Sequence, residues 1–103
     1  MIDTITVAKE YLKRKEWKLI DNDIPVAIDD DGDLVICEVI ESTDKFSEKA
    51  PYKMTTSEFE SISFDILKDI SDLDSCNVKH DVIEIVYISK DRVFIKHWHD
   101  VHY

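Results

Sequence analysis

Three histidines near the carboxyl end of the chain have the residue type and spacing to bind a transition metal. His97 and His99 are two residues apart, so on a strand both imidazoles would face one side, and His102 follows them. Imidazoles arranged in this way bind Zn²⁺ or Ni²⁺. The sequence does not identify a carboxylate or thiol partner, and such a tail is also typical of simple packing or exposure. A metal site at His97, His99 and His102 is therefore an alternative to a packed or exposed tail.

An acidic run, Asp29-Asp30-Asp31-Gly32-Asp33, has some likeness to a calcium-binding loop. An EF-hand loop that began at Asp29 would need a glutamate at its twelfth position, and Ile40 occupies that position. Glycine tolerates a positive φ angle, which suits the tight turn of a β-hairpin. The run is therefore predicted to be a solvated hairpin turn.

Other catalytic patterns do not emerge from the sequence. The single glycine lies in the predicted turn, so there is no glycine-rich phosphate loop, and no Ser/His/Asp set or nucleophilic cysteine arrangement is recognisable. Cys37 and Cys76 are the only cysteines, without a second pair for a zinc site. We expect both to be unoxidised thiols.

The charge of the chain limits its partners. The 103 residues, expected to form a single domain over 1–103, include 23 acidic and 13 basic residues, a formal net charge of −10. This charge disfavours nucleic acid, whose phosphates it repels, and favours a basic protein partner or self-association through a strand edge. The only basic cluster is predicted to be a solvated helix face; it comprises Lys9, Lys13, Arg14, Lys15 and Lys18.

Neither a long apolar run nor a signal-like N-terminus is present, so we expect a cytoplasmic protein without membrane contact. Hydrophobic periodicity predicts the elements in the following order: a helix over 2–16, strands over 17–20, 24–28 and 34–39, a loop over 41–53, a helix over 55–73, and strands over 80–88 and 92–98. This order, α-β-β-β-α-β-β, predicts an α/β domain with one mixed five-stranded sheet and two main helices.

Several short motifs match, in order and spacing, those of a known family. The matching residues are Ala8, Tyr11, Leu12, Leu19 and Asn22, the strand segments 22–27 and 34–40, His80-Asp81-Val82-Ile83-Glu84-Ile85, and the closing segment 95–102. Along nearly its whole length the chain resembles the YraN family of predicted endonucleases, a restriction-endonuclease-like group related in fold to Holliday-junction resolvases. The resemblance implies a restriction-endonuclease-like core.

The resemblance also implies four catalytic positions, and three of them have lost the expected side chain. Glu38 keeps the glutamate of the family's Glu-x-Lys motif, but Ile40 stands at the lysine, Pro25 at the strand aspartate and Ile5 at the helix glutamate. Pro25 and Ile40 are expected beside Glu38 on one face of the hairpin. Such nucleases need two acidic groups to hold Mg²⁺ and a lysine to activate water. Glu38 alone is predicted to be a partly buried, hydrogen-bonded carboxylate.

Two functions follow as hypotheses. The first is a degenerate, non-catalytic nuclease-fold protein that acts as a binding or interaction module, requires no cofactor, and meets a protein partner or a second copy of itself. The alternative is a divergent endonuclease acting on DNA, in which Mg²⁺ or Mn²⁺ is held by Glu38 with Asp23 or an acid of the 29–31 turn.

Overall fold

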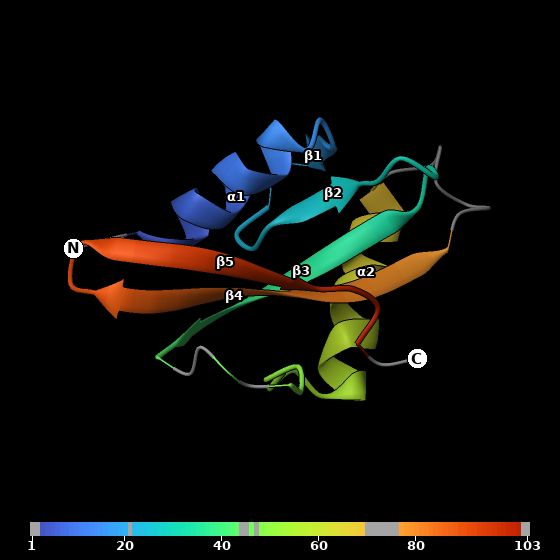
Figure 1. Cartoon of the computed structure of the whole chain (residues 1–103). Coiled ribbons are helices and arrows are strands. Elements are labelled where there is room, and N and C mark those ends of the chain that lie inside the picture. Colours follow the sequence, from blue (N-terminus) through green and yellow to red (C-terminus); the bar gives the residue numbers. More distant parts are fainter. Residues whose placement is uncertain (1–2, 21, 44–45, 47, 70–76, 102–103) are drawn as a thin grey trace.

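The computed structural model describes residues 3–20, 22–43, 46, 48–69 and 77–101. Its elements are α1 (Thr4–Arg14), β1 (Lys18–Ile20), β2 (Val26–Ile28), β3 (Leu34–Ser42), α2 (Thr56–Asp69), β4 (Val78–Ser89) and β5 (Arg92–Trp98). One sheet has the strand order β1-β2-β3-β4-β5; β3 and β4 are parallel, and the other neighbours are antiparallel (Figure 1). The predicted α/β class, the mixed five-stranded sheet and the element order are confirmed.

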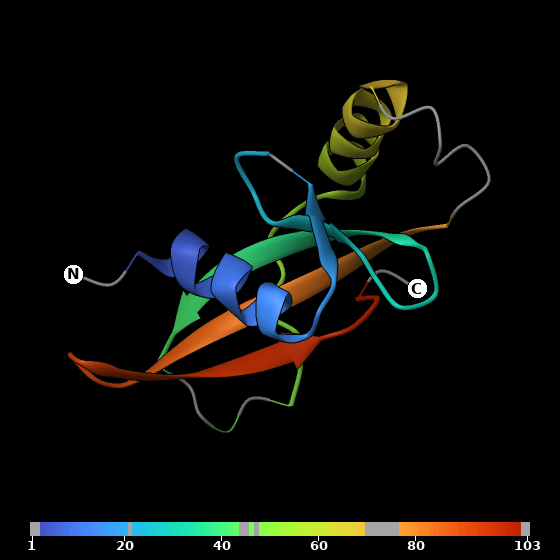
Figure 2. The ribbon, with the colours of Figure 1, turned by 90° about the horizontal axis from the view of Figure 1, so that it is seen from above.

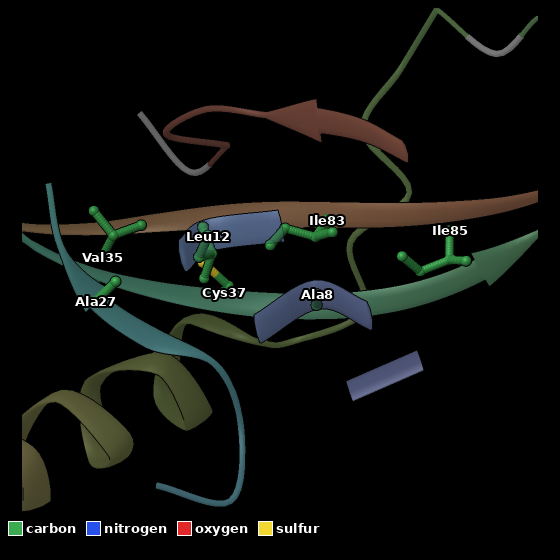
Figure 3. Packing of buried hydrophobic residues seen from close by; sticks show 7 residues of the cluster. All are labelled: Ala8, Leu12, Ala27, Val35, Cys37, Ile83 and Ile85. Atoms are coloured by element: carbon green, nitrogen blue, oxygen red, sulfur yellow. The ribbon is translucent and has the colours of Figure 1, made fainter. Parts of the chain in front are cut away.

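The sheet has two faces, each with its own core. Successive side chains of a strand point to opposite faces. We call the face that carries Cys37 and is covered by α1 the α1 face; the face that carries Glu38 and is covered by α2 is the α2 face. The α1-face core, drawn in Figure 3, consists of Ala8, Leu12, Ala27, Val35, Cys37, Ile83 and Ile85. The α2-face core consists of Val26, Leu34, Ile36, Phe59 and Ile66.

Helix α1 has defined ends. The Asp3 carboxylate accepts a hydrogen bond from the backbone N–H of Thr6 (3.3 Å) and so caps the first turn. At the other end Glu16 has a φ of 66°, a left-handed backbone conformation that residues other than glycine rarely adopt. The backbone N–H of Trp17 donates to the carbonyl of Leu12 (3.3 Å). This turn reverses the chain and brings Trp17 back against the α1 face.

The turn between β2 and β3 is built around one aspartate. One Asp29 carboxylate oxygen accepts the backbone N–H groups of Asp31 and Asp33, both at 3.0 Å. Gly32 supplies the positive φ of 82° that the turn requires. The predicted hairpin turn is confirmed, although Asp29 itself is not solvated: only 8% of its side chain is exposed.

Most element boundaries differ from the sequence prediction by one or two residues, and those of β3 and α2 differ by more. β3 continues through Glu41 and Ser42, which were expected to begin a loop, because both remain paired with β4 as far as Val86. Helix α2 ends at Asp69, and the rest of the predicted helix over 55–73 lies outside the described residues.

Replacing an isoleucine of β4 with alanine should reduce the free energy of unfolding by very different amounts at a buried site and at an exposed site. Ile83 is fully buried between α1 and the sheet, so Ile83→Ala should lower the free energy of unfolding by about 3 kcal/mol. Ile88 on the same strand is 46% exposed, and Ile88→Ala should cost less than about 1 kcal/mol. Urea unfolding followed by circular dichroism measures both values; equal losses would contradict this description of the core.

Candidate functional site

The four positions implied by the nuclease resemblance do not meet at one site. Glu38 and Ile40 lie on the α2 face, where Ile40 is 7% exposed. Pro25 lies opposite Cys37, whose backbone N–H donates to its carbonyl (2.9 Å), so the register places Pro25 on the α1 face. The prediction that Pro25 lies beside Glu38 on one face is wrong, because the register is offset by one residue.

Ile5 adds to this separation. It lies on α1, in the helical stripe that includes Ala8 and Leu12, and α1 covers the face opposite Glu38. Restoring acidic groups at Ile5 and Pro25 would therefore put them across the sheet from Glu38. For the alternative with Asp23, that residue is exposed in the loop before β2.

Glu38 is a hydrogen-bonded structural carboxylate, as predicted. Its oxygens accept the backbone N–H groups of Lys53 (2.7 Å) and Met54 (3.1 Å). The Nε2 atom of the fully buried His80 lies 3.1 Å from the Glu38 Oε1 atom, to which the N–H of Met54 also donates. The His80 ring in turn stacks on Phe59 of α2. These contacts attach the segment before α2 to the sheet and leave 11% of the Glu38 side chain exposed.

The α1 face ends in a cavity of about 340 Å³, which we call the acidic cavity. The turn after α1, the β2–β3 turn, the start of β4 and the end of β5 meet there, at one end of the sheet (Figure 2). The lining residues are Lys15, Trp17, Asp29, Asp30, Asp31, Lys79, Asp81, His99 and Asp100. Five carboxylates against two ammonium groups make this cavity favourable for cations.

Lys79 neutralises part of this charge. Its Nζ atom lies 2.9 Å from an Asp29 carboxylate oxygen, 3.1 Å from Asp33 and 3.8 Å from Asp31. The hydrogen bonds to Asp29 and Asp33 raise the pKa of Lys79. Burial alone would raise the pKa of Asp29, but the bonds from Lys79 and from the turn amides outweigh burial and hold that pKa below its usual range. The acidic residues of this turn therefore form ion pairs with Lys79, in place of the calcium-binding loop considered from the sequence.

At the edge of the cavity, three residues form what we call the Asp81 cluster: Asp81, His97 and His99. Their possible metal-ligating atoms all lie within 4.8 Å of one another. The Asp81 side chain is 1% exposed and that of His97 is 5% exposed, whereas His99 is 58% exposed. The His97 and His99 rings stack with centroids 3.8 Å apart. Pairing of β4 with β5 brings the carboxylate to the His-x-His pair.

Two aromatic residues enclose the cluster. The Tyr11 hydroxyl lies 2.8 Å from the His97 Nδ1 atom, and Trp17 packs edge-on against the His97 ring. Burial raises the pKa of Tyr11, and Cys37 and Asp81 act in the same direction. Partial burial lowers the pKa of His99, with His97 and Lys15 acting alike and Asp81 opposing them.

No protein-family model and no curated protein sequence matches this chain.

The sequence identified His97 and His99 but not the carboxylate beside them. His102, the third predicted ligand, lies outside the described residues, as does Cys76. Cys37 is a free thiol, as expected, and burial raises its pKa. Of the basic cluster predicted as a solvated helix face, Lys13 and Arg14 are exposed on α1, whereas Lys18 is exposed but lies on β1. Lys9 is half-buried and donates a hydrogen bond to the carbonyl of Asn22 (3.0 Å). Lys15 instead lies over the rings of Tyr11 and Trp17 at the cavity.

The contacts of Glu38 predict a stabilising role. Glu38→Ala should lower the free energy of unfolding by about 1–3 kcal/mol, because it leaves backbone N–H groups and His80 without their acceptor. Amide hydrogen exchange at Met54 should accelerate in parallel. Glu41→Ala, on the same strand but exposed, is the matched control and should change stability by less than about 0.5 kcal/mol. A gain in stability on removing Glu38 would show that this carboxylate is strained rather than structural.

The ion pair with Lys79 predicts a change in the titration of Asp29. In Lys79→Met, the pKa of Asp29 should rise, because burial then acts with less opposition. In the native chain the folded-state pKa is below the unfolded value of about 3.9, so Asp29 contributes stability above that pH and loses it as the pH falls through the folded pKa. Carboxyl ¹³C NMR titration measures the shift, with exposed Lys90→Met as control. An unchanged Asp29 titration would mean that Lys79 is not its dominant partner.

Proposed function

We propose that this chain is a non-catalytic binding module that recognises a cationic segment of a protein partner through the acidic cavity. In this proposal the YraN-like pattern reflects a shared restriction-endonuclease-like scaffold without the nuclease site. The observation that carries it is the bonding of Glu38. The one retained catalytic side chain is held by Lys53, Met54 and His80 and lies across the sheet from Ile5 and Pro25.

Charge supports a basic protein partner. The chain has a formal net charge of −10, and the cavity concentrates five carboxylates at one end of the sheet. Lysine and arginine side chains are attracted to such a surface, whereas DNA phosphates are repelled from it. A second copy of this chain has the same net charge, which makes it less suited to the cavity than a basic protein. The described residues include no helix long and apolar enough to cross a membrane.

The cavity also offers aromatic surface. Trp17 lines it, and the Lys15 ammonium group lies 5.1 Å from the Trp17 ring centroid. An incoming lysine or arginine could occupy the same aromatic environment while its charge meets the aspartates. Asp30 and Asp31 are exposed at the rim and are therefore the first groups a partner would meet.

A nuclease assay tests the absence of catalysis. The intact chain, incubated with Mg²⁺ or Mn²⁺ and with branched, single-stranded and double-stranded DNA, should cleave none of them, because Glu38 is occupied and Ile40 provides no charge. Metal-dependent cleavage that disappears in Glu38→Ala but persists in Glu41→Ala would overturn this part of the proposal and support the endonuclease alternative.

A peptide titration tests the binding role. A lysine- and arginine-rich peptide, added to ¹⁵N-labelled protein, should shift the Trp17 indole signal and the amide signals of Asp30 and Asp100. Asp30→Asn and Asp31→Asn should each weaken binding roughly threefold, since an exposed ion pair contributes about 0.2–1 kcal/mol. Asp91→Asn, an exposed acid in the β4–β5 turn, is the control. Shifts distributed over the whole surface, or equal losses in all three variants, would argue against the cavity as the binding site.

A further inference from the structure

The Asp81 cluster has the geometry of a set of converging metal ligands. His97 Nε2 lies 2.7 Å and His99 Nδ1 lies 3.3 Å from the same carboxylate oxygen, Oδ2 of Asp81. Two imidazole nitrogens and a carboxylate thus point to one small volume at the edge of the acidic cavity. Two of the three groups are almost completely buried.

We infer that Asp81, His97 and His99 form a binding site for a divalent transition metal ion, with Zn²⁺ the best-fitting ion. Imidazole and carboxylate ligands together suit Zn²⁺, which accepts three protein ligands and a water molecule in a tetrahedral arrangement. The exposed side of His99 and the adjacent cavity provide a path for the ion and room for that water. Mg²⁺ and Ca²⁺ prefer oxygen ligands and would bind here more weakly.

The residues behind the ligands match what metal sites require. A histidine that binds metal through one ring nitrogen usually donates the other N–H to an acceptor, which fixes the ring. The Tyr11 hydroxyl oxygen, 2.8 Å from His97 Nδ1, can accept that hydrogen bond. The second oxygen of Asp81 accepts the backbone N–H of Asp100 at 2.8 Å, which fixes the carboxylate.

Only small movements would be needed to admit the ion. Ligands about 2.1 Å from a tetrahedral zinc lie about 3.4 Å from one another. The distance of 3.3 Å between His99 Nδ1 and Asp81 Oδ2 already agrees with this value. The distance of 2.7 Å between His97 Nε2 and Asp81 Oδ2 must increase, because the metal ion replaces the proton of that hydrogen bond. The Asp29, Asp31 and Asp33 group has no comparable role, since Lys79 already lies among its carboxylates.

This inference is independent of the proposed protein partner and is tested without one. Calorimetric titration of the intact chain with Zn²⁺ in a non-chelating buffer should show one site. His99→Ala should weaken binding at least about 100-fold, and Tyr11→Phe about 10-fold, the range expected for a residue that orients a ligand. His99 is more than half exposed, so its replacement should leave the fold intact. Asp91→Asn is the control, because it removes a carboxylate from the exposed β4–β5 turn without removing a ligand, and it should bind Zn²⁺ normally.

Histidine ring ¹⁵N NMR gives a second readout that does not depend on any variant. Zn²⁺ should shift the ring nitrogens of His97 and His99 but leave those of His80 unchanged, because His80 lies on the α2 face against Glu38. Absence of Zn²⁺ binding would overturn the inference and leave His97 as a structural bridge between Tyr11 and Asp81. Zn²⁺ binding that is unchanged in His99→Ala, or lost equally in Asp91→Asn, would also overturn it.

Discussion

The parallel pairing of β3 with β4 is the constraint on which the rest of the structure depends. Nine residue pairs, from Leu34 with Val78 to Ser42 with Val86, fix this register. Because side chains alternate, the register assigns every polar group of the two strands to one face. Glu38 and His80 meet on the α2 face, and Asp81 falls on the α1 face with His97. A shift of one residue would place Glu38 in the core under α1.

This pairing produces two polar clusters with different properties. Around Glu38, backbone N–H groups and a buried histidine occupy the carboxylate, and the segment before α2 covers it. Around Asp81, the carboxylate is more deeply buried than that of Glu38, but one of its two histidines is exposed beside an open cavity. The first cluster is suited to holding the fold together. The second has the access that ligand binding requires, and it lies on the face that carries no residue of the Glu38 site.

Much of the fold could be predicted from the sequence because its signals are local. Helical spacing around Ala8 and Leu12, the acidic turn with Gly32, and the alternating strands after residue 80 each specify an element within a few residues. The site depends on contacts between distant residues. Tyr11 meets His97 across 86 positions, and Asp81 meets His97 only through the β4–β5 register. The face of Pro25 was mispredicted for the same reason, since an alignment to a family pattern does not determine how two strands are offset.

The central strand pair also has a consequence for how the chain reaches this structure. β3 and β4 are joined through α2, so their partners lie 44 positions apart, as in Leu34 with Val78, whereas each hairpin closes over a few residues. Closing the larger loop costs chain entropy before its contacts form, which makes this step slow relative to hairpin formation. Until it is complete, β3 and β4 each have an unpaired edge with apolar residues on both sides. Such edges can pair with other chains, so the order of assembly, and not only final stability, determines how well this domain avoids aggregation.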